Sequence, residues 1–107
     1  DCNLIEVTGG EPLMQPECID LLNTLISEKY EVMLETGGSL SITNVPINVK
    51  KIVDFKCPSS NMENKNLWDI VQDLQKHDEV KFVISNQIDF EYKEVFIPVN
   101  KNIKLKL

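Results

Sequence analysis

The chain has 107 residues, 42% of them hydrophobic and 26% charged, which is the ordinary composition of a globular domain. Its 17 acidic and 11 basic side chains give a net charge of −6, which excludes an extended nucleic-acid surface but not a small anionic ligand. No apolar stretch approaches the roughly 18–20 residues that span a bilayer, and no signal peptide is recognisable, so we expect a cytoplasmic protein without a membrane partner.

The first half of the chain predicts a strand, a helix and a second strand. Apolar runs at residues 4–7 and 31–34 have strand character. Between them, Pro16 suits the first turn of a helix, and an apolar stripe follows at Cys18, Leu22, Leu25 and Ile26. Residues 37–50 then contain Pro46 and several Ser, Thr and Asn residues, which argues against a long helix.

The second half repeats this alternation. Apolar runs at 51–55 and 80–84 predict two more strands, and the middle two of the four runs are nearly continuous, as in strands covered on both faces. Leu67, Ile70, Val71 and Leu74 have helical spacing, with Asn64 or Asn66 as the candidate cap. We therefore predict an α/β domain over residues 1–107, with about four parallel strands and two crossover helices.

The C-terminal part is less regular. Residues 89–92 predict a short helix, and Val95-Phe96-Ile97 predicts a further strand that Pro98 ends. The tail from Asn100 is polar and basic, and it predicts no element.

Polar and glycine-rich loops follow all four predicted strands, at residues 8–12, 35–39, 56–60 and 85–87. The carboxyl ends of parallel strands lie on one edge of a sheet, where ligands bind, so we expect a binding site there. Gly9 and Gly10 offer bare backbone amides, and Glu11 offers a carboxylate to an ammonium group. The alternative for this first loop is a tight turn with an incidental acid.

The remaining loops add hydroxyl and charged groups. Ser39, Ser59 and Ser60 can bond ribose hydroxyls or a carboxylate. Lys56 either pairs with an anionic ligand or stays solvated, and Asp54 needs a partner if it is buried.

The cysteines and the single histidine predict no metal site in this chain. Cys2, Cys18 and Cys57 are far apart and odd in number, which excludes a disulfide scaffold and any CxxC-like ligand spacing. Cys57 is expected to fill apolar space, since no general base for it is visible. His77, at a helix end beside Asp78, is expected on the surface, and Trp68 is expected to pack rather than stack on a ligand.

Several motifs carry a resemblance to a known family. Val7-Thr8-Gly9-Gly10-Glu11-Pro12 resembles the GGEP motif of radical S-adenosylmethionine enzymes, which lies in a partial (β/α)₆ barrel. Within that superfamily, four further segments resemble 7-carboxy-7-deazaguanine synthases: residues 34–39, 52–62, 78–84 and 89–92. The resemblance extends over about residues 4–92.

The resemblance implies a function and a set of site residues. The family converts 6-carboxy-5,6,7,8-tetrahydropterin to 7-carboxy-7-deazaguanine for queuosine and related 7-deazapurines, using a [4Fe–4S] cluster, S-adenosylmethionine and Mg²⁺. By motif, Gly9, Gly10 and Glu11 would hold the methionine moiety, and Thr8 would contact the pterin substrate. The rest of the cofactor would lie against Ser39 and the turn formed by Cys57, Pro58, Ser59 and Ser60.

Three departures from the family pattern stand out. Gly37 replaces the usual Asn and Asn61 the usual Gly, and both types tolerate positive φ, so we expect these turns to survive. The CxxxCxxC loop that ligates the cluster is not in this sequence, and Cys2 cannot replace it. Because that loop is missing, we expect the chain alone to be inactive. Since it also starts at Asp1 rather than Met, we expect it to be the middle of such an enzyme.

Two other interpretations remain open. The chain could come from a different radical S-adenosylmethionine enzyme, of the activating type, or it could be a cluster-free domain for nucleotide binding or protein interaction. A partial sheet of four strands would expose an edge where the first strand should pair, so we expect the isolated chain to dimerise or aggregate through that edge. For the native protein we expect a homodimer.

Overall fold

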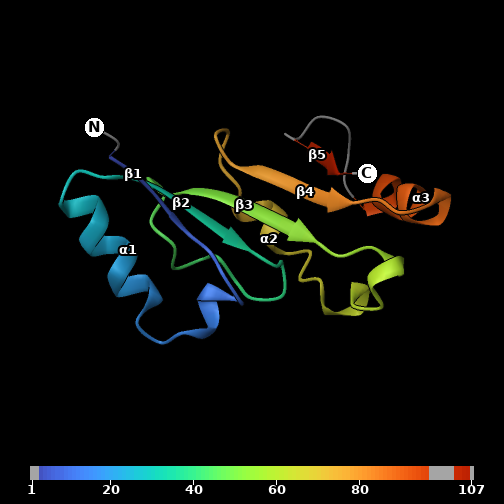
Figure 1. Cartoon of the computed structure of the whole chain (residues 1–107), viewed down its shortest axis with the longest axis horizontal. Helices are drawn as coiled ribbons and strands as arrows, with labels where there is room; N and C mark the ends of the chain where they lie inside the picture. Colours follow the sequence, from blue (N-terminus) through green and yellow to red (C-terminus); the bar gives the residue numbers. More distant parts are fainter. Residues whose placement is uncertain (1–2, 97–102, 107) are drawn as a thin grey trace.

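The computed structural model describes residues 3–96 and 103–106 of the chain, and it confirms the predicted α/β class. Its parallel sheet has the order β1-β2-β3-β4-β5, with β1 at Leu4–Val7, β2 at Glu31–Thr36, β3 at Lys50–Phe55, β4 at Glu79–Val83 and β5 at Ile103–Lys106. Each strand pairs in parallel with the next, so the strand arrows point the same way and their carboxyl ends share one edge (Figure 1).

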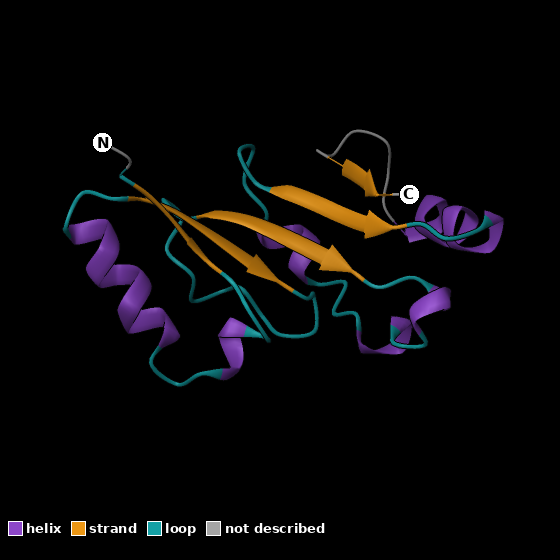
Figure 2. Cartoon of the chain, viewed as in Figure 1, coloured by secondary structure: helices purple, strands orange, loops and turns teal. Residues whose placement is uncertain are grey.

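Two helices lie in the connections between strands, and a third follows β4 (Figure 2). α1 (Cys18–Ser27) joins β1 to β2, and the short α2 (Ile70–Asp73) lies between β3 and β4. α3 (Gln87–Phe96) follows β4 and lies beyond the carboxyl end of that strand. Three single 3₁₀ turns, η1 (Pro12–Met14), η2 (Pro58–Ser60) and η3 (Glu63–Lys65), lie in the loops. The β2–β3 connection contains no helix, as predicted.

The core lies on one face of the sheet. Leu34, Val53 and Phe82 are fully buried there, and they pack with Leu22 of α1 and Ile70 of α2. Burial alternates along β2 and β3, and Met33, Glu35, Ile52 and Asp54 on the other face are only partly buried. The expectation that these strands are covered on both faces is therefore wrong for the described residues, because the described helices pack against one face.

The second predicted helix is shorter than its apolar spacing suggested. The α-helix is confined to Ile70–Asp73 because the residues before it make other contacts. The Leu67 amide donates to the Gly38 carbonyl at 2.7 Å, and the Asn66 side chain bonds the backbone of Lys56 instead of capping a helix. Tertiary contacts have thus replaced the first helical turn.

The C-terminal prediction also needs correction. Residues 89–92 are helical, as predicted, but the helix continues through Val95 and Phe96, which were expected in a strand; Ile97 lies outside the described residues. Phe96 stacks on Trp68 at a centroid distance of 4.5 Å, which favours the helical course and confirms a packing role for Trp68. The tail, for which no element was expected, supplies β5.

The opposite edge of the sheet carries a buried ion pair. Lys51 Nζ lies 3.2 Å from Asp78 Oδ2, with both side chains at most 2% exposed, and Asp78 also accepts the amide of Lys51. The side chain of His77 is half-exposed at this edge, as expected. None of the helices in the described part of the chain is long and apolar enough to cross a membrane.

Candidate functional site

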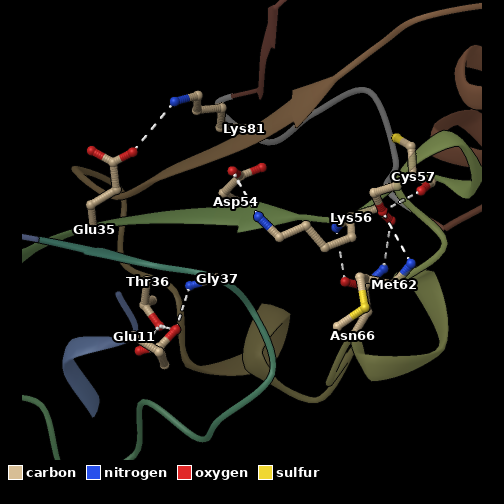
Figure 3. A network of polar contacts seen from close by, with 11 residues as sticks. Glu11, Glu35, Thr36, Gly37, Asp54, Lys56, Cys57, Met62, Asn66 and Lys81 are labelled. Carbon is tan, nitrogen blue, oxygen red and sulfur yellow. Dashed lines mark hydrogen bonds and ion pairs between the residues drawn. The ribbon is translucent and has the colours of Figure 1, made fainter. Parts of the chain in front are cut away.

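The polar loops after β1, β2, β3 and β4 meet at the carboxyl edge of the sheet, as predicted (Figure 3). The edge brings together Glu11 from the first loop, Thr36 and Gly37 at the end of β2 and directly after it, and Asp54 and Lys56 at the end of β3 and directly after it. These side chains come from segments up to 45 positions apart in the sequence, and the parallel pairing of the strands assembles them.

The first loop presents open backbone. Gly9 and Gly10 have φ angles of +91° and +52°, and a Cβ atom on either residue would meet no heavy atom within 4 Å. Positive φ is a reason for glycine at both positions, and the free space in front of them is what a ligand approaching the backbone requires. Thr8, the predicted substrate contact, is exposed immediately before them.

Glu11 connects the first loop to the second. Its carboxylate accepts hydrogen bonds from the Thr36 hydroxyl at 2.8 Å, from the Gly37 amide at 2.7 Å and from the Leu13 amide at 2.9 Å. The carboxylate is therefore already engaged within the protein, and an ammonium group would have to share it. The direct effect of Glu11 is to hold two loops in register.

Of the two positions that depart from the family pattern, Asn61 adopts positive φ, at +60°, and Gly37 does not. The positive-φ residue of the second loop is Gly38, at +81°. A Cβ on Gly37 would approach Glu11 Oε1 to 3.3 Å, so the close passage of the carboxylate is the observed constraint at this position.

The start of the loop after β3 is held by hydrogen bonds with the Asn66 side chain. Asn66 accepts the Lys56 amide at 2.9 Å and donates to the Lys56 carbonyl at 2.8 Å, which imitates a strand partner. Cys57 is 3% exposed, and burial, with Asp89 and Asp54 nearby, raises the pKa of its thiol to about 11. The thiol is thus protonated at neutral pH, consistent with the expected filling role.

A pocket of about 340 Å³ opens beside this loop. Its lining comes from the ends of β3 and β4 and the loops after them: Asp54, Phe55, Lys56, Cys57, Ser59, Ser60, Val83 and Ser85. Lys56 pairs with Asp54 Oδ2 at 3.0 Å, so it is neither free for a ligand nor simply solvated. Within the described part of the chain, the other oxygen, Asp54 Oδ1, is buried without a hydrogen-bond partner, which leaves acceptor capacity beside the pocket.

The predicted site residues therefore fall into separate groups. Cys57, Ser59 and Ser60 line the pocket, and Pro58 begins the 3₁₀ turn that carries both serines. Gly9, Gly10 and Glu11 lie in the first loop and are tied to β2 through Thr36. Ser39 is exposed in the second loop and is not part of the pocket lining.

Asp89 is a residue of this edge that the sequence did not single out for a role. It is fully buried in the first turn of α3 and accepts the amides of Ser59 and Ser85. Burial alone would raise the pKa of its carboxyl, but hydrogen bonds from Ser85, Ser59 and Asn86 outweigh burial and lower that pKa below its ordinary value. The signal in the sequence that could have pointed to this residue was an Asp at the start of a predicted helix.

The described residues do not fit an iron–sulfur cluster or another metal centre. No group of three or more His, Cys, Asp or Glu side chains within residues 3–96 and 103–106 is arranged to hold a metal ion. Cys18 and Cys57 are free and buried, and Cys2 lies outside the described residues.

Comparison with known proteins confirms the family resemblance. The chain is 43% identical over 94 residues to the 7-carboxy-7-deazaguanine synthase of Koribacter versatilis, 38% identical over 92 residues to that of Methanospirillum hungatei, and 34% identical over 100 residues to that of Chlorobaculum tepidum. These alignments cover 87%, 85% and 91% of the chain. No family model matches the chain.

The chain corresponds to only part of these relatives. It covers 42%, 38% and 46% of the three proteins, respectively, or about two fifths of each. The similarity therefore concerns a segment of a 7-carboxy-7-deazaguanine synthase.

Proposed function

We propose that this chain, which is similar to 7-carboxy-7-deazaguanine synthases along most of its length, is a segment of such an enzyme and contributes its S-adenosylmethionine-binding edge. The intact enzyme would convert 6-carboxy-5,6,7,8-tetrahydropterin to 7-carboxy-7-deazaguanine as a carbon–nitrogen lyase. The observation that carries the proposal is the GGEP loop, whose glycine backbone faces open space beside a loop-bridging carboxylate.

The residues of the edge fit S-adenosylmethionine in their chemistry. The open amides of Gly9 and Gly10 suit a carboxylate, and Glu11 can accept from an ammonium group while it holds the second loop. Ser59 and Ser60 line the pocket, and their hydroxyls, which already bond Asn86 and the Cys57 carbonyl, have the chemistry to bond an adenosine moiety as well. Thr8 is exposed, and we assign it to the proposed pterin substrate. Bound S-adenosylmethionine would supply the deoxyadenosyl group for the radical chemistry of the reaction.

The cluster and the Mg²⁺ ion are not assigned to this segment. The described residues do not fit either group, so no step at a metal is derived from them. We expect the 107-residue chain alone to be inactive, and we assign to it the binding and orientation of the organic cofactor. The native homodimer and the cytoplasmic location are further parts of this proposal.

The proposal is tested by replacing Gly10 with Ala in the full-length enzyme. The added methyl group meets no protein atom, so the cost to folding is limited to the backbone strain of about 1–2 kcal/mol at positive φ. It does occupy the space through which the ligand reaches the backbone. Calorimetric titration should show roughly tenfold or greater loss of S-adenosylmethionine affinity, with loss of pterin conversion.

Ser27→Ala is the control, because Ser27 ends α1 just before the amino end of β2, away from the loops at the carboxyl edge. Within the described residues its hydroxyl donates to the Thr24 carbonyl of the same helix. This variant should bind and turn over normally. Wild-type protein that does not bind S-adenosylmethionine, or a G10A variant with unchanged affinity, contradicts the proposal.

A further inference from the structure

Asp89 occupies an unusual position for a charged residue. Its side chain is 0% exposed, yet its carboxylate stays ionised through hydrogen bonds from two separate loops. Oδ1 accepts the Ser59 amide at 2.9 Å and Oδ2 accepts the Ser85 amide at 2.8 Å. The Asp89 amide in turn donates to Asn86 Oδ1 at 2.9 Å, which fixes the start of α3.

The two amides belong to two different loops that line the 340 Å³ pocket. Ser59 lies in the η2 turn after β3, and Ser85 lies two residues after Val83, the last residue of β4; both line the pocket. A second contact, from Asn86 Nδ2 to the Ser59 hydroxyl at 3.1 Å, joins the same two loops at the surface. Asp89 does not line the pocket, so it lies behind the walls that it connects.

The chemistry of these contacts requires a carboxylate. The Ser59 and Ser85 amides are both backbone donors, and each meets a different oxygen of the side chain. The Ser59 hydroxyl and the Asn86 amide also favour the ionised form. Asparagine of the same shape has one acceptor oxygen and would turn its amide group toward the other backbone N–H. A neutral side chain would therefore release one loop while leaving the helix intact.

We propose that Asp89 is a positioning residue that fixes the separation of the loops after β3 and β4 and thereby sets the affinity of the pocket for its ligand. It does so without contact with the ligand itself. The identification of that ligand as S-adenosylmethionine rests on the proposed function, whereas the bridging of the loops rests on the observed contacts alone.

The first test is amide hydrogen exchange in wild-type protein and in Asp89→Asn. In wild-type protein the amides of Ser59 and Ser85 should both be protected. The D89N variant should release at least one of them, with roughly tenfold or faster exchange. Unprotected amides in wild-type protein at neutral pH overturn the proposal, even if no variant folds.

The second test is ligand affinity in the full-length enzyme, measured as the Kd of S-adenosylmethionine. D89N should weaken binding by roughly tenfold or more. Glu91→Gln makes the same charge change on an exposed position of α3 and should bind as wild type. Val80→Ala removes buried volume from β4 away from the loops, so it should lose stability and keep its affinity.

The outcomes separate this proposal from the function on which it rests. Wild-type affinity in D89N, or an equal loss of affinity in V80A, overturns the positioning role while the proposed function stands. Wild-type protein that fails to bind S-adenosylmethionine overturns the proposed function, and the ligand role of Asp89 falls with it.

Discussion

Glycines of two kinds occur at the carboxyl edge, although their backbone angles are similar. Gly9 has φ +91° and open space around it, whereas Gly38 has φ +81° and lies against the core. A Cβ on Gly38 would approach Phe55 Cδ1 to 2.8 Å, closer than real contacts allow. The second glycine therefore serves packing, whereas the first leaves open space, which we propose a ligand uses.

Replacing each glycine with Ala should separate these roles. Gly38→Ala should lower the free energy of unfolding by about 2–5 kcal/mol, because backbone strain adds to a clash with a buried aromatic ring. Gly9→Ala should cost only the strain, about 1–2 kcal/mol. Urea denaturation of both variants checks the order, and equal losses of stability would contradict the packing role of Gly38.

The N-terminus of α3 is joined to the sheet through one carboxylate. Asp89 bonds the loops after β3 and β4, and the aromatic residues of the same helix pack on Trp68. By contrast, the residue before α1, Glu17, makes no capping bond with its side chain. The attachment of α3 thus depends on a charge, and it should respond to pH.

The direction of that response follows from the lowered pKa of Asp89. The folded protein releases this proton more readily than the unfolded chain does, so the carboxylate adds stability above the ordinary Asp pKa of about 4. That contribution is lost as the pH falls through the lowered folded-state pKa. The stability difference between wild type and D89N should therefore be largest near neutral pH, at about 1–3 kcal/mol, and shrink in acid.

Urea denaturation of both proteins across this pH range measures the difference. A difference that grows toward low pH would mean that burial dominates and that the pKa of Asp89 is raised instead.

In the molecule as a whole, β1 forms an edge of the sheet. Among the described residues it pairs only with β2, and its outer face carries Leu4, which is 44% exposed. Unpaired strand edges with exposed apolar side chains favour association between chains. The predicted self-association therefore has a defined surface, namely β1.

We predict that the isolated chain associates through β1, and that Leu4→Lys weakens this association by placing a charge on the edge strand. Multi-angle light scattering over a concentration series measures the effect. Met14→Lys is the control, because Met14 is 72% exposed and lies outside the sheet. A monomeric wild-type chain at high concentration, or equal effects of the two substitutions, contradicts the prediction.

Local sequence was sufficient for the four strands that have apolar runs, and for the loops that follow them. Such runs have few alternatives to burial in a sheet, and parallel pairing then brings the loops to one edge without further information. The GGEP loop was also recognisable from local sequence, since paired glycines beside a Glu indicate open backbone next to a carboxylate. The family resemblance depended on these short segments in order.

Other features depended on contacts between distant segments. α2 is short because Asn66 bonds Lys56 and Leu67 bonds Gly38. In the sequence of β5, lysines alternate with Ile103 and Leu105, and this segment is a strand because it pairs with β4. Asp89 acquired its role from amides 30 and 4 positions away. Hydrophobic periodicity is a property of residues that are neighbours in the sequence, so the strands could be predicted from it. The hydrogen-bond partners of a side chain depend on which distant segments the fold brings together, so the contacts of Asn66 and Asp89 could not be predicted.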